Sequence, residues 1–266
     1  MIKLLLDVDT GIDDALALFF LAHAQKQGQL EILGSTTVGG NAEVAQTTLN
    51  TLKIWEMLEL EIPVASGAER PLLGPLETAP FVHGDDGLGN TFLSVPRESA
   101  SEESAVDMIL RLSHKYFGEL TLLTTAPLTN IAVALLRDTS LAGRIRNLVI
   151  MGGAVFSGNV SAVAEANITN DPEAARIVFH SGMEMTLVGL DVTHGVLAED
   201  DIREGPELSQ PLVAVLLSLA ATHIHVIYIV PGEQVQGGVV VQAGQPGLPR
   251  GGIAQRRLTA HVGVVA

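Results

Sequence analysis

Short apolar runs alternate with segments that carry apolar residues at helical spacing, and this alternation limits the fold of the chain more than any other feature. The first run, Ile2–Val8, ends in acidic residues, and residues 13–27 follow it with Ala15, Leu18 and Ala22 at helical spacing. A run without polar alternation is typical of a strand buried on both faces. Such strands, separated by helices, predict an α/β protein with a mostly parallel central sheet flanked by helices on both faces.

The same pattern extends along most of the chain. We expect further strands at residues 30–38, 64–66, 120–125, 148–151 and 185–190. We expect further helices at 42–58, 102–116 and 127–136, and one that is capped by Asp171 with Pro172 in its first turn. Residues 71–96 and 152–166 are expected to be loops. The pattern predicts a single domain built on a Rossmann-like open sheet, whose ligands bind beyond the carboxyl ends of the strands.

The charge and the residue types of the chain exclude several partners. The 266 residues carry a formal charge of −15, which would repel a phosphate backbone, so we expect no nucleic-acid partner. The chain has no cysteine, which excludes disulfides and a cysteine nucleophile and is compatible with a reducing cytoplasm. The apolar run before Asp7 is too short for a signal peptide, and polar residues interrupt 212–229. We therefore expect a cytoplasmic protein without a membrane span.

Residues 229–266 differ in composition from the rest of the chain. They hold eight of the 27 glycines and carry a formal charge of +2, whereas residues 1–228 carry −17. Hydrophobic periodicity also fades after Val230. We therefore divide the sequence into an α/β domain, residues 1–228, and an atypical Gly-rich C-terminal tail, residues 229–266.

Four carboxylates lie within eight residues at the end of the first expected strand, namely Asp7, Asp9, Asp13 and Asp14. Their mutual repulsion is costly unless a cation lies among them. Oxygen ligands without Cys or His nearby suit Ca²⁺ or Mg²⁺. Stabilisation of a helix N-terminus by Asp13 and Asp14 would explain one or two of the four carboxylates. The cluster therefore predicts a metal site.

The same segment, followed by Ala15, resembles the N-terminal signature Asp-x-Asp-x-Gly-x-Asp-Asp-Ala of the nucleoside hydrolases. Further segments resemble motifs of that family and follow in the order of the family, over about residues 2–200. These segments are Gly40 with Asn41, Asn50, 83–89, 125–130 (with Ala126 where the family has Gly), 151–153, Gly158 with Asn159, 165–167, 171–175 and 191–194. Their number and order make the chain similar to the inosine-uridine preferring type of nucleoside hydrolase.

The resemblance implies that the chain hydrolyses the N-glycosidic bond of ribonucleosides to ribose and free base with a calcium-activated water. Asp9, Asp14 and the backbone carbonyl of Thr125 would hold Ca²⁺. Asp9 would also be the catalytic general base, and Asp7 would support the loop from behind. The residues implied to bind the substrate are His83 near the base and, at the ribose hydroxyls, Asp13, Asn41, Asn159, Glu165 and Asn167.

This set of residues suits the chemistry of the implied reaction. Positive charge develops on the sugar in the transition state, and carboxylate and amide oxygens around the ribose favour that charge. A calcium ion lowers the pKa of the water that it binds. Structural roles compete for some positions: His83 could equally anchor its Gly-rich loop, Asn130 is expected to satisfy a helix start, and Asp171 is expected to be a cap.

The C-terminal region departs from the family pattern. The family has a His-Asp-Pro segment whose Asp completes the calcium shell and whose His lies near the leaving base. No His-Asp pair occurs after Asn167, and residues 236–242 of the corresponding region read Gln-Gly-Gly-Val-Val-Val-Gln. Either the tail is genuinely divergent or the reading frame shifted near residues 223–228, and the abrupt change in charge and glycine content favours a frameshifted C-terminus. Loss of a carboxylate ligand is expected to weaken calcium binding and to impair activity.

Two other functions compete with nucleoside hydrolysis. A catalytically impaired chain would bind a ribonucleoside or calcium without turnover. Asp7-x-Asp9-Thr10 also resembles the nucleophile loop of Mg-dependent, haloacid-dehalogenase-type phosphatases, but that alternative leaves Asp13 and Asp14 unexplained. The sequence does not distinguish purine from pyrimidine substrates, since the base-side residues lie in loops and in the atypical region. The resemblance further implies a homo-oligomer, either a dimer or a tetramer.

Overall fold

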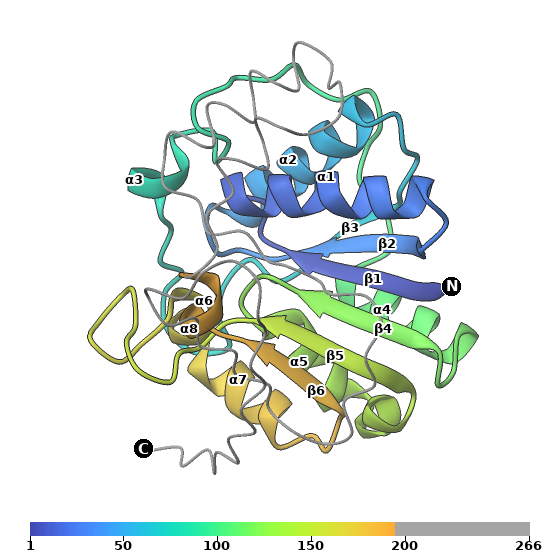
Figure 1. The fold of residues 1–266 in the computed structure, drawn as a ribbon, viewed down its shortest axis with the longest axis vertical. Helices are drawn as coiled ribbons and strands as arrows, with labels where there is room; N and C mark the ends of the chain where they lie inside the picture. Colours follow the sequence, from blue (N-terminus) through green and yellow to red (C-terminus); the bar gives the residue numbers. More distant parts are fainter. Residues whose placement is uncertain (195–266) are drawn as a thin grey trace, which may run out of the picture.

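The computed structural model describes residues 1–194, and these residues build one six-stranded sheet in which every strand pairing is parallel (Figure 1). The order of the strands is β3-β2-β1-β4-β5-β6, so the chain moves outward from β1 in one direction and then returns to continue outward from β4. The strands are β1 Ile2–Val8, β2 Leu30–Thr37, β3 Val64–Ser66, β4 Leu120–Thr124, β5 Ile145–Met151 and β6 Met185–Val188. This arrangement confirms the expected open parallel sheet of the Rossmann-like kind.

Helices connect these strands, and the longer ones begin and end close to the expected residues. They are α1 Ile12–Lys26, α2 Val44–Met57, α3 Pro80–His83, α4 Ala105–Lys115, α5 Thr129–Arg137, α6 Ala166–Asn170, α7 Pro172–Phe179 and α8 Leu190–Thr193, with a 3-10 helix η1 at Thr139–Gly143. The expected loop at 71–96 contains the short helix α3, which the sequence pattern did not indicate. Asp171 caps α7 as expected, because its carboxylate accepts a hydrogen bond from the Ala174 N–H at 3.0 Å.

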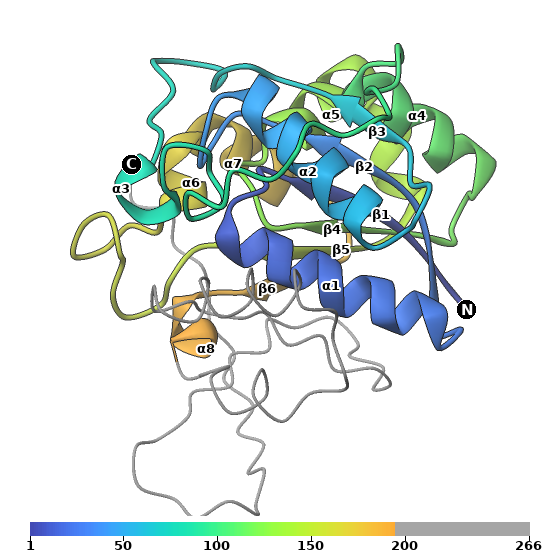
Figure 2. The ribbon, with the colours of Figure 1, turned by 90° about the horizontal axis from the view of Figure 1, so that it is seen from above.

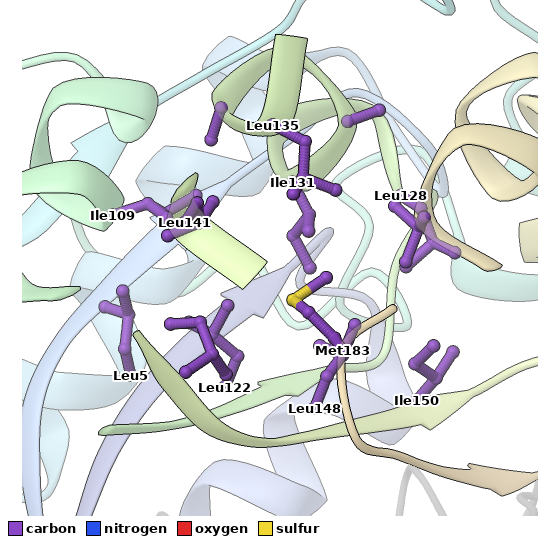
Figure 3. Packing of buried hydrophobic residues seen from close by; sticks show 14 of the residues in the cluster. Leu5, Ile109, Leu122, Leu128, Ile131, Leu135, Leu141, Leu148, Ile150 and Met183 are labelled. Carbon is purple, nitrogen blue, oxygen red and sulfur yellow. The ribbon is translucent and has the colours of Figure 1, made fainter. Parts of the chain in front are cut away.

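Two hydrophobic layers cover the sheet, which is why the strands read as continuous apolar runs. Leu4 and Leu6 of β1 lie in one cluster with apolar residues of α1 and α2. Leu5 points to the opposite face, into a second cluster with residues of α4, α5 and α7, and Figure 3 shows part of this cluster. Each leucine buried in this way stabilises the fold by about 1.5–3 kcal/mol relative to an exposed one. The helices therefore flank both faces of the sheet, as expected.

The carboxyl ends of the strands share one end of the molecule. Figure 1 shows the strand arrows pointing toward the end where α3, α6 and α8 lie, and Figure 2 shows α3 and α6 at the same end from above. The order of the strands reverses between β1 and β4, and ligands of open α/β sheets bind beyond the strands at such a point. Residues that follow β1 and β4 are therefore placed to meet there.

Several expectations lie outside the described residues. These are the interrupted apolar run at 212–229, the boundary at residue 228 and the Gly-rich tail at 229–266. Within residues 1–194, no helix is long and apolar enough to cross a lipid bilayer.

Candidate active site

The centre of the candidate site is a pair of carboxylates at the carboxyl end of β1. Asp9 follows the last residue of β1, and Asp14 lies in the first turn of α1, where its Oδ2 accepts a hydrogen bond from the Gly11 N–H at 2.9 Å. The side chains are almost fully enclosed, since Asp9 is 1% exposed and Asp14 is 2% exposed. Two buried acids in neighbouring positions are costly for folding alone, which indicates a functional role.

Asn41, which follows β2, connects the two carboxylates. Its backbone N–H donates to Asp9 Oδ2 at 2.7 Å, and its side-chain amide donates to Asp14 Oδ2 at 3.3 Å. The neighbouring Gly40 packs directly against Asp9, because a Cβ on Gly40 would lie 2.1 Å from Asp9 Oδ2. The β2–α2 connection therefore holds Asp9 and Asp14 in one fixed arrangement.

Thr125 joins the pair from the position directly after β4, the strand that pairs with β1 on the side away from β2. The Thr125 N–H donates to the carbonyl of Asp7 at 3.1 Å, which places Thr125 beside the end of β1. The Thr125 hydroxyl makes a short hydrogen bond to Asp14 Oδ1. The backbone carbonyl of Thr125 in turn accepts from the side-chain amide of Asn167 at 2.8 Å. The structure thus brings Asp9, Asp14, Thr125 and Asn167 together.

The remaining residues expected at the ribose lie in the segment between β5 and α6. Glu165 caps α6, and its carboxylate accepts from the backbone N–H groups of Asn167 at 3.0 Å and Gly153 at 2.9 Å. Asn159 accepts from the Ala166 N–H through Oδ1 at 3.0 Å. Both side chains are therefore held by backbone amides near Asn167, and neither contacts Asp9 or Asp14 directly through a hydrogen bond.

His83 and Asp13 lie over the turn that connects β1 to α1. His83 Nδ1 accepts a hydrogen bond from the Ile12 N–H at 3.2 Å and lies 3.9 Å from Asp13 Oδ1. A ring nitrogen that accepts a hydrogen bond carries no proton itself. Gly11 allows this contact, because a Cβ there would lie 2.6 Å from Nδ1. His83 therefore does anchor its loop, and it does so directly beside the carboxylates.

Asn130 has a larger structural role than the expected helix start. It lies buried in the first turn of α5, where its amide donates to Asp7 Oδ1 at 2.8 Å and to the carbonyl of Thr37 at 2.9 Å. Its Oδ1 accepts from the Ala68 N–H at 2.9 Å. Asn130 and Asp7 thereby tie together the carboxyl ends of β1, β2 and β3 behind the site, in the supporting role expected of Asp7. The only signal in the sequence was a polar residue at the start of a helix that follows a buried strand.

Burial and like charge dominate the electrostatics of the site. Burial raises the pKa of Asp9 well above its usual range, and the charge of Asp14 raises that pKa further. Burial and the nearby Asp13 raise the pKa of Asp14 to about 7. Burial also raises the pKa of Asp7 to about 6. Asp9 Oδ1 and Asp7 Oδ2 are buried without a hydrogen-bond partner. An enclosed pair of acids with an unpartnered oxygen is suited to a cation.

Two carboxylates, those of Asp9 and Asp14, are placed where such a cation could lie. The third carboxylate of the family pattern, the Asp of the His-Asp-Pro segment, has no counterpart in the sequence. Within residues 1–194, no group of three or more His, Asp or Glu side chains is arranged so that it could hold a metal ion. The carboxylates of Asp9 and Asp14 are oxygen ligands of the kind that Ca²⁺ accepts, whereas the carbonyl of Thr125 accepts a hydrogen bond from the Asn167 amide. The two carboxylates are fewer oxygen donors than a complete calcium site takes, so they could supply only part of one.

We expect the metal-free protein to lose stability as the pH rises from about 4 to about 7. The folded-state pKa of Asp7 is about 6 and that of Asp14 about 7, against an ordinary value of 3.8. Between these values the folded chain binds more protons than the unfolded chain, so the free energy of unfolding falls as the pH rises. For Asp7 alone, the shift corresponds to about 3 kcal/mol.

Urea unfolding in the presence of a chelator at pH 4.5 and pH 7.5 measures this loss. Asp107 and Asp138, whose pKa values are lowered by hydrogen bonds to serine and arginine side chains, titrate below this window and do not offset the effect. The variant Asp7→Asn should show a smaller difference between the two pH values. A metal-free protein that is more stable at pH 7.5 than at pH 4.5 would contradict the assignment.

The fold and the site together define a class of protein. An open parallel sheet with buried carboxylates at its switch point is the arrangement of an α/β protein that acts on a small ligand. Comparisons with known proteins make the class specific, since residues 4–237 match the family model described as inosine-uridine preferring nucleoside hydrolase. The chain therefore belongs to the inosine-uridine preferring nucleoside hydrolase family.

Individual relatives agree with this assignment. Uridine nucleosidase 1 from Arabidopsis thaliana is 45% identical over 206 residues, which cover 76% of this chain and 60% of that protein. A plant nucleoside hydrolase structure superposes with a TM-score of 0.76 at 36% identity, over 83% of this chain and 71% of that one. A purine-preferring ribonucleoside hydrolase from Gardnerella vaginalis gives a TM-score of 0.75 at 36% identity, over 82% of this chain and 71% of that one. The chain spans about 60% of the length of the curated relatives that it matches.

Proposed function

We propose that this chain hydrolyses the N-glycosidic bond of ribonucleosides and that Asp9 is its general base. The observation that carries the proposal is the buried pair Asp9 and Asp14 at the switch point, in which Asp9 Oδ1 has no partner. An enclosed carboxylate with an unpartnered oxygen is suited to take a proton from an attacking water once a neighbouring cation favours its ionised form. Membership of the family and the activities in the names of its relatives support the type of reaction.

We propose calcium as the cofactor, held by Asp9, Asp14 and the carbonyl of Thr125. A divalent cation would favour the ionised form of both acids, whose pKa values are raised mainly by burial and further by neighbouring aspartates. When bound, calcium would lower the pKa of the attacking water. Asn41 would hold the two carboxylates in a fixed relative position, since it donates a hydrogen bond to each.

The residues around this centre would bind the ribose. Asp13 has a side-chain oxygen without a hydrogen-bond partner, so it is available to accept from a sugar hydroxyl. The acids and amides on this side also favour the positive charge that develops on the sugar in the transition state. Hydrogen bonds to hydroxyls discriminate strongly against a deoxyribose that lacks one of them. The proposed ribose ligands are Asp13, Asn41, Asn159, Glu165 and Asn167, with His83 on the side of the base.

One second candidate is favoured by a specific observation. No His-Asp pair follows Asn167 in the sequence, so a protein that binds ribonucleoside or calcium with little turnover is the alternative. The phosphatase alternative has no support from the family assignment. The base preference is open, because the relatives include a uridine nucleosidase and a purine-preferring hydrolase. A dimer or tetramer and a cytoplasmic location stay predictions.

We expect this protein to release p-nitrophenol from p-nitrophenyl β-D-ribofuranoside in the presence of calcium. This leaving group departs without protonation, so its release tests Asp9, Asp14 and the ribose residues without a leaving-group acid. Removal of calcium should lower the rate by about 10²-fold or more, since a metal ion supplies several kcal/mol of stabilisation. Initial rates with calcium, with a chelator and after calcium is restored measure the effect.

Natural nucleosides separate the two candidates. Hydrolysis of uridine or inosine would show a complete enzyme, whereas release from the nitrophenyl riboside alone would show an impaired one. Calcium or ribose binding by calorimetry without any release would support the binding protein. Release of phosphate from p-nitrophenyl phosphate, with no release from the riboside, would overturn the proposal in favour of a phosphatase.

A further inference from the structure

The segment between β5 and α6 carries two proposed ribose ligands but has little apolar packing of its own. Asn159 lies at its centre and Glu165 at its end. Its apolar side chains point outward, since Val155 is 56% exposed, Phe156 is 74% exposed and Val163 is 82% exposed. The hydrophobic effect therefore does little to fix this segment, and polar contacts must determine its position.

Asp191, in the first turn of α8, supplies the side-chain contact that fixes the outer part of the segment. Its Oδ2 accepts from the Val155 N–H at 2.5 Å, and its Oδ1 accepts from the Phe156 N–H at 3.1 Å. Hydrogen bonds from backbone amides to a carboxylate are stronger than those between neutral groups. An acid in the first turn of a helix usually stabilises its own helix. Here both carboxylate oxygens accept instead from residues that lie far away in the sequence.

The backbone of the segment transmits this anchor to the ribose ligands. The Leu190 N–H donates to the Gly153 carbonyl at 3.0 Å, so the start of the segment is attached to α8 as well. Beyond Phe156 the chain closes on itself, because the Asn159 N–H donates to the Ala164 carbonyl at 3.0 Å. Gly158 lies so close to Ala164 that a Cβ would come within 2.1 Å of the Ala164 oxygen. A shift of residues 155–156 would therefore move the turn that holds Asn159.

We propose that Asp191 is a positioning residue for ribose binding, acting through the segment 153–165. This inference rests on the proposed function and assigns a role to the last motif of the chain, which neither the calcium ligands nor the ribose ligands include. Without Asp191 the segment also populates positions in which Asn159 and Glu165 cannot reach the ribose. Substrate then binds only the fraction of molecules in which the segment is correctly placed. The apparent affinity then falls in proportion to the competent fraction, whereas a bound substrate reacts as before.

The test compares Asp191→Ala and Asp191→Asn with the unmodified protein and with Asp107→Asn as a control. Asp107 pairs with Arg137 at the end of α5 that lies away from the site. For Asp191→Ala we expect hydrogen exchange in a peptide covering 154–164 to accelerate at least about tenfold. We expect KM for the nitrophenyl riboside to rise about tenfold with kcat changed less than about twofold. Asp191→Asn retains one acceptor oxygen, so its KM should lie between that of the unmodified protein and that of Asp191→Ala.

A double-mutant cycle with Asn159→Ala tests the route of the effect. In the Asn159→Ala background, Asp191→Ala should raise KM clearly less than it does alone, because the residue through which it acts is gone. General structural damage would instead lower kcat through loss of active protein and leave KM unchanged. An Asp191→Ala protein with unchanged KM and unchanged exchange would overturn the inference. Absence of hydrolysis by the unmodified protein would overturn the proposed function, whereas the exchange experiment measures the anchor independently of activity.

Discussion

Replacement of Asp9 by Asn is expected to lower kcat for the riboside by about 10²–10⁴-fold, the contribution of a general base. The amide has nearly the shape of the carboxylate and can keep the contact with the Asn41 N–H through its oxygen. It cannot accept a proton from water, and it removes a negative charge from the proposed calcium site. Steady-state kinetics with saturating calcium measure the loss. The control is Asp107→Asn in α4, where Asp107 pairs with Arg137 at the far end of α5.

Stability should change in the opposite direction in the same variant. The raised pKa of Asp9 means that its ionised form is unfavourable in the folded, metal-free protein at neutral pH. Asp9→Asn removes that cost, so the metal-free variant should melt at a higher temperature than the unmodified protein. Added calcium should stabilise the unmodified protein more than the variant, because binding to the folded state adds stability. A variant that keeps its activity would contradict the role of Asp9 as the base. A metal-free variant that melts at a lower temperature than the unmodified protein would contradict the predicted cost of its ionised form.

The fold was predictable where local pattern and tertiary burial agree. β1 has the expected bounds because its apolar run stops abruptly at the acids that follow it, and both of its faces are buried. The short helices were not predictable for a physical reason. α6 is capped by Glu165, which is an unusual capping residue, and Glu165 is held in place by the Gly153 N–H from the other arm of the loop. Such a helix depends on contacts that arise only after the chain has folded back.

The location of the site was also predictable, but its internal connections were not. The carboxyl ends of parallel strands meet at one edge, so residues after β1, β2 and β4 had to converge there. The spacing of these residues in the sequence does not indicate which hydrogen bonds their side chains form in the folded protein. Asn41 was expected at the ribose, and the structure shows it bonded to Asp9 and Asp14. Asp191 belonged to a recognised motif without an assigned role until its contacts to the loop were seen.

Replacement of Gly40 by Ala is expected to disable the site without removing any of its functional groups. The added Cβ would lie 2.1 Å from Asp9 Oδ2 and 2.9 Å from Asp9 Cγ. A short side chain cannot move aside without rotating its carboxylate, and that rotation would break the bond from the Asn41 N–H. Displacement of a reacting group by about 1 Å costs on the order of 10²-fold in rate, and overpacking costs about 1–3 kcal/mol of stability.

Gly143→Ala is the matched control, because a Cβ at Gly143 meets nothing within 4 Å and adds the same methyl group. We expect Gly143→Ala to have the kcat and calcium affinity of the unmodified protein. Gly40→Ala should bind calcium more weakly as well, since the displaced carboxylate is also a proposed calcium ligand. Calorimetric titration with calcium and kinetics on the nitrophenyl riboside together measure both effects. If Gly40→Ala is as active as Gly143→Ala, then the position of Asp9 held by Asn41 is not the reactive one, and Asp9 must act from a different rotamer.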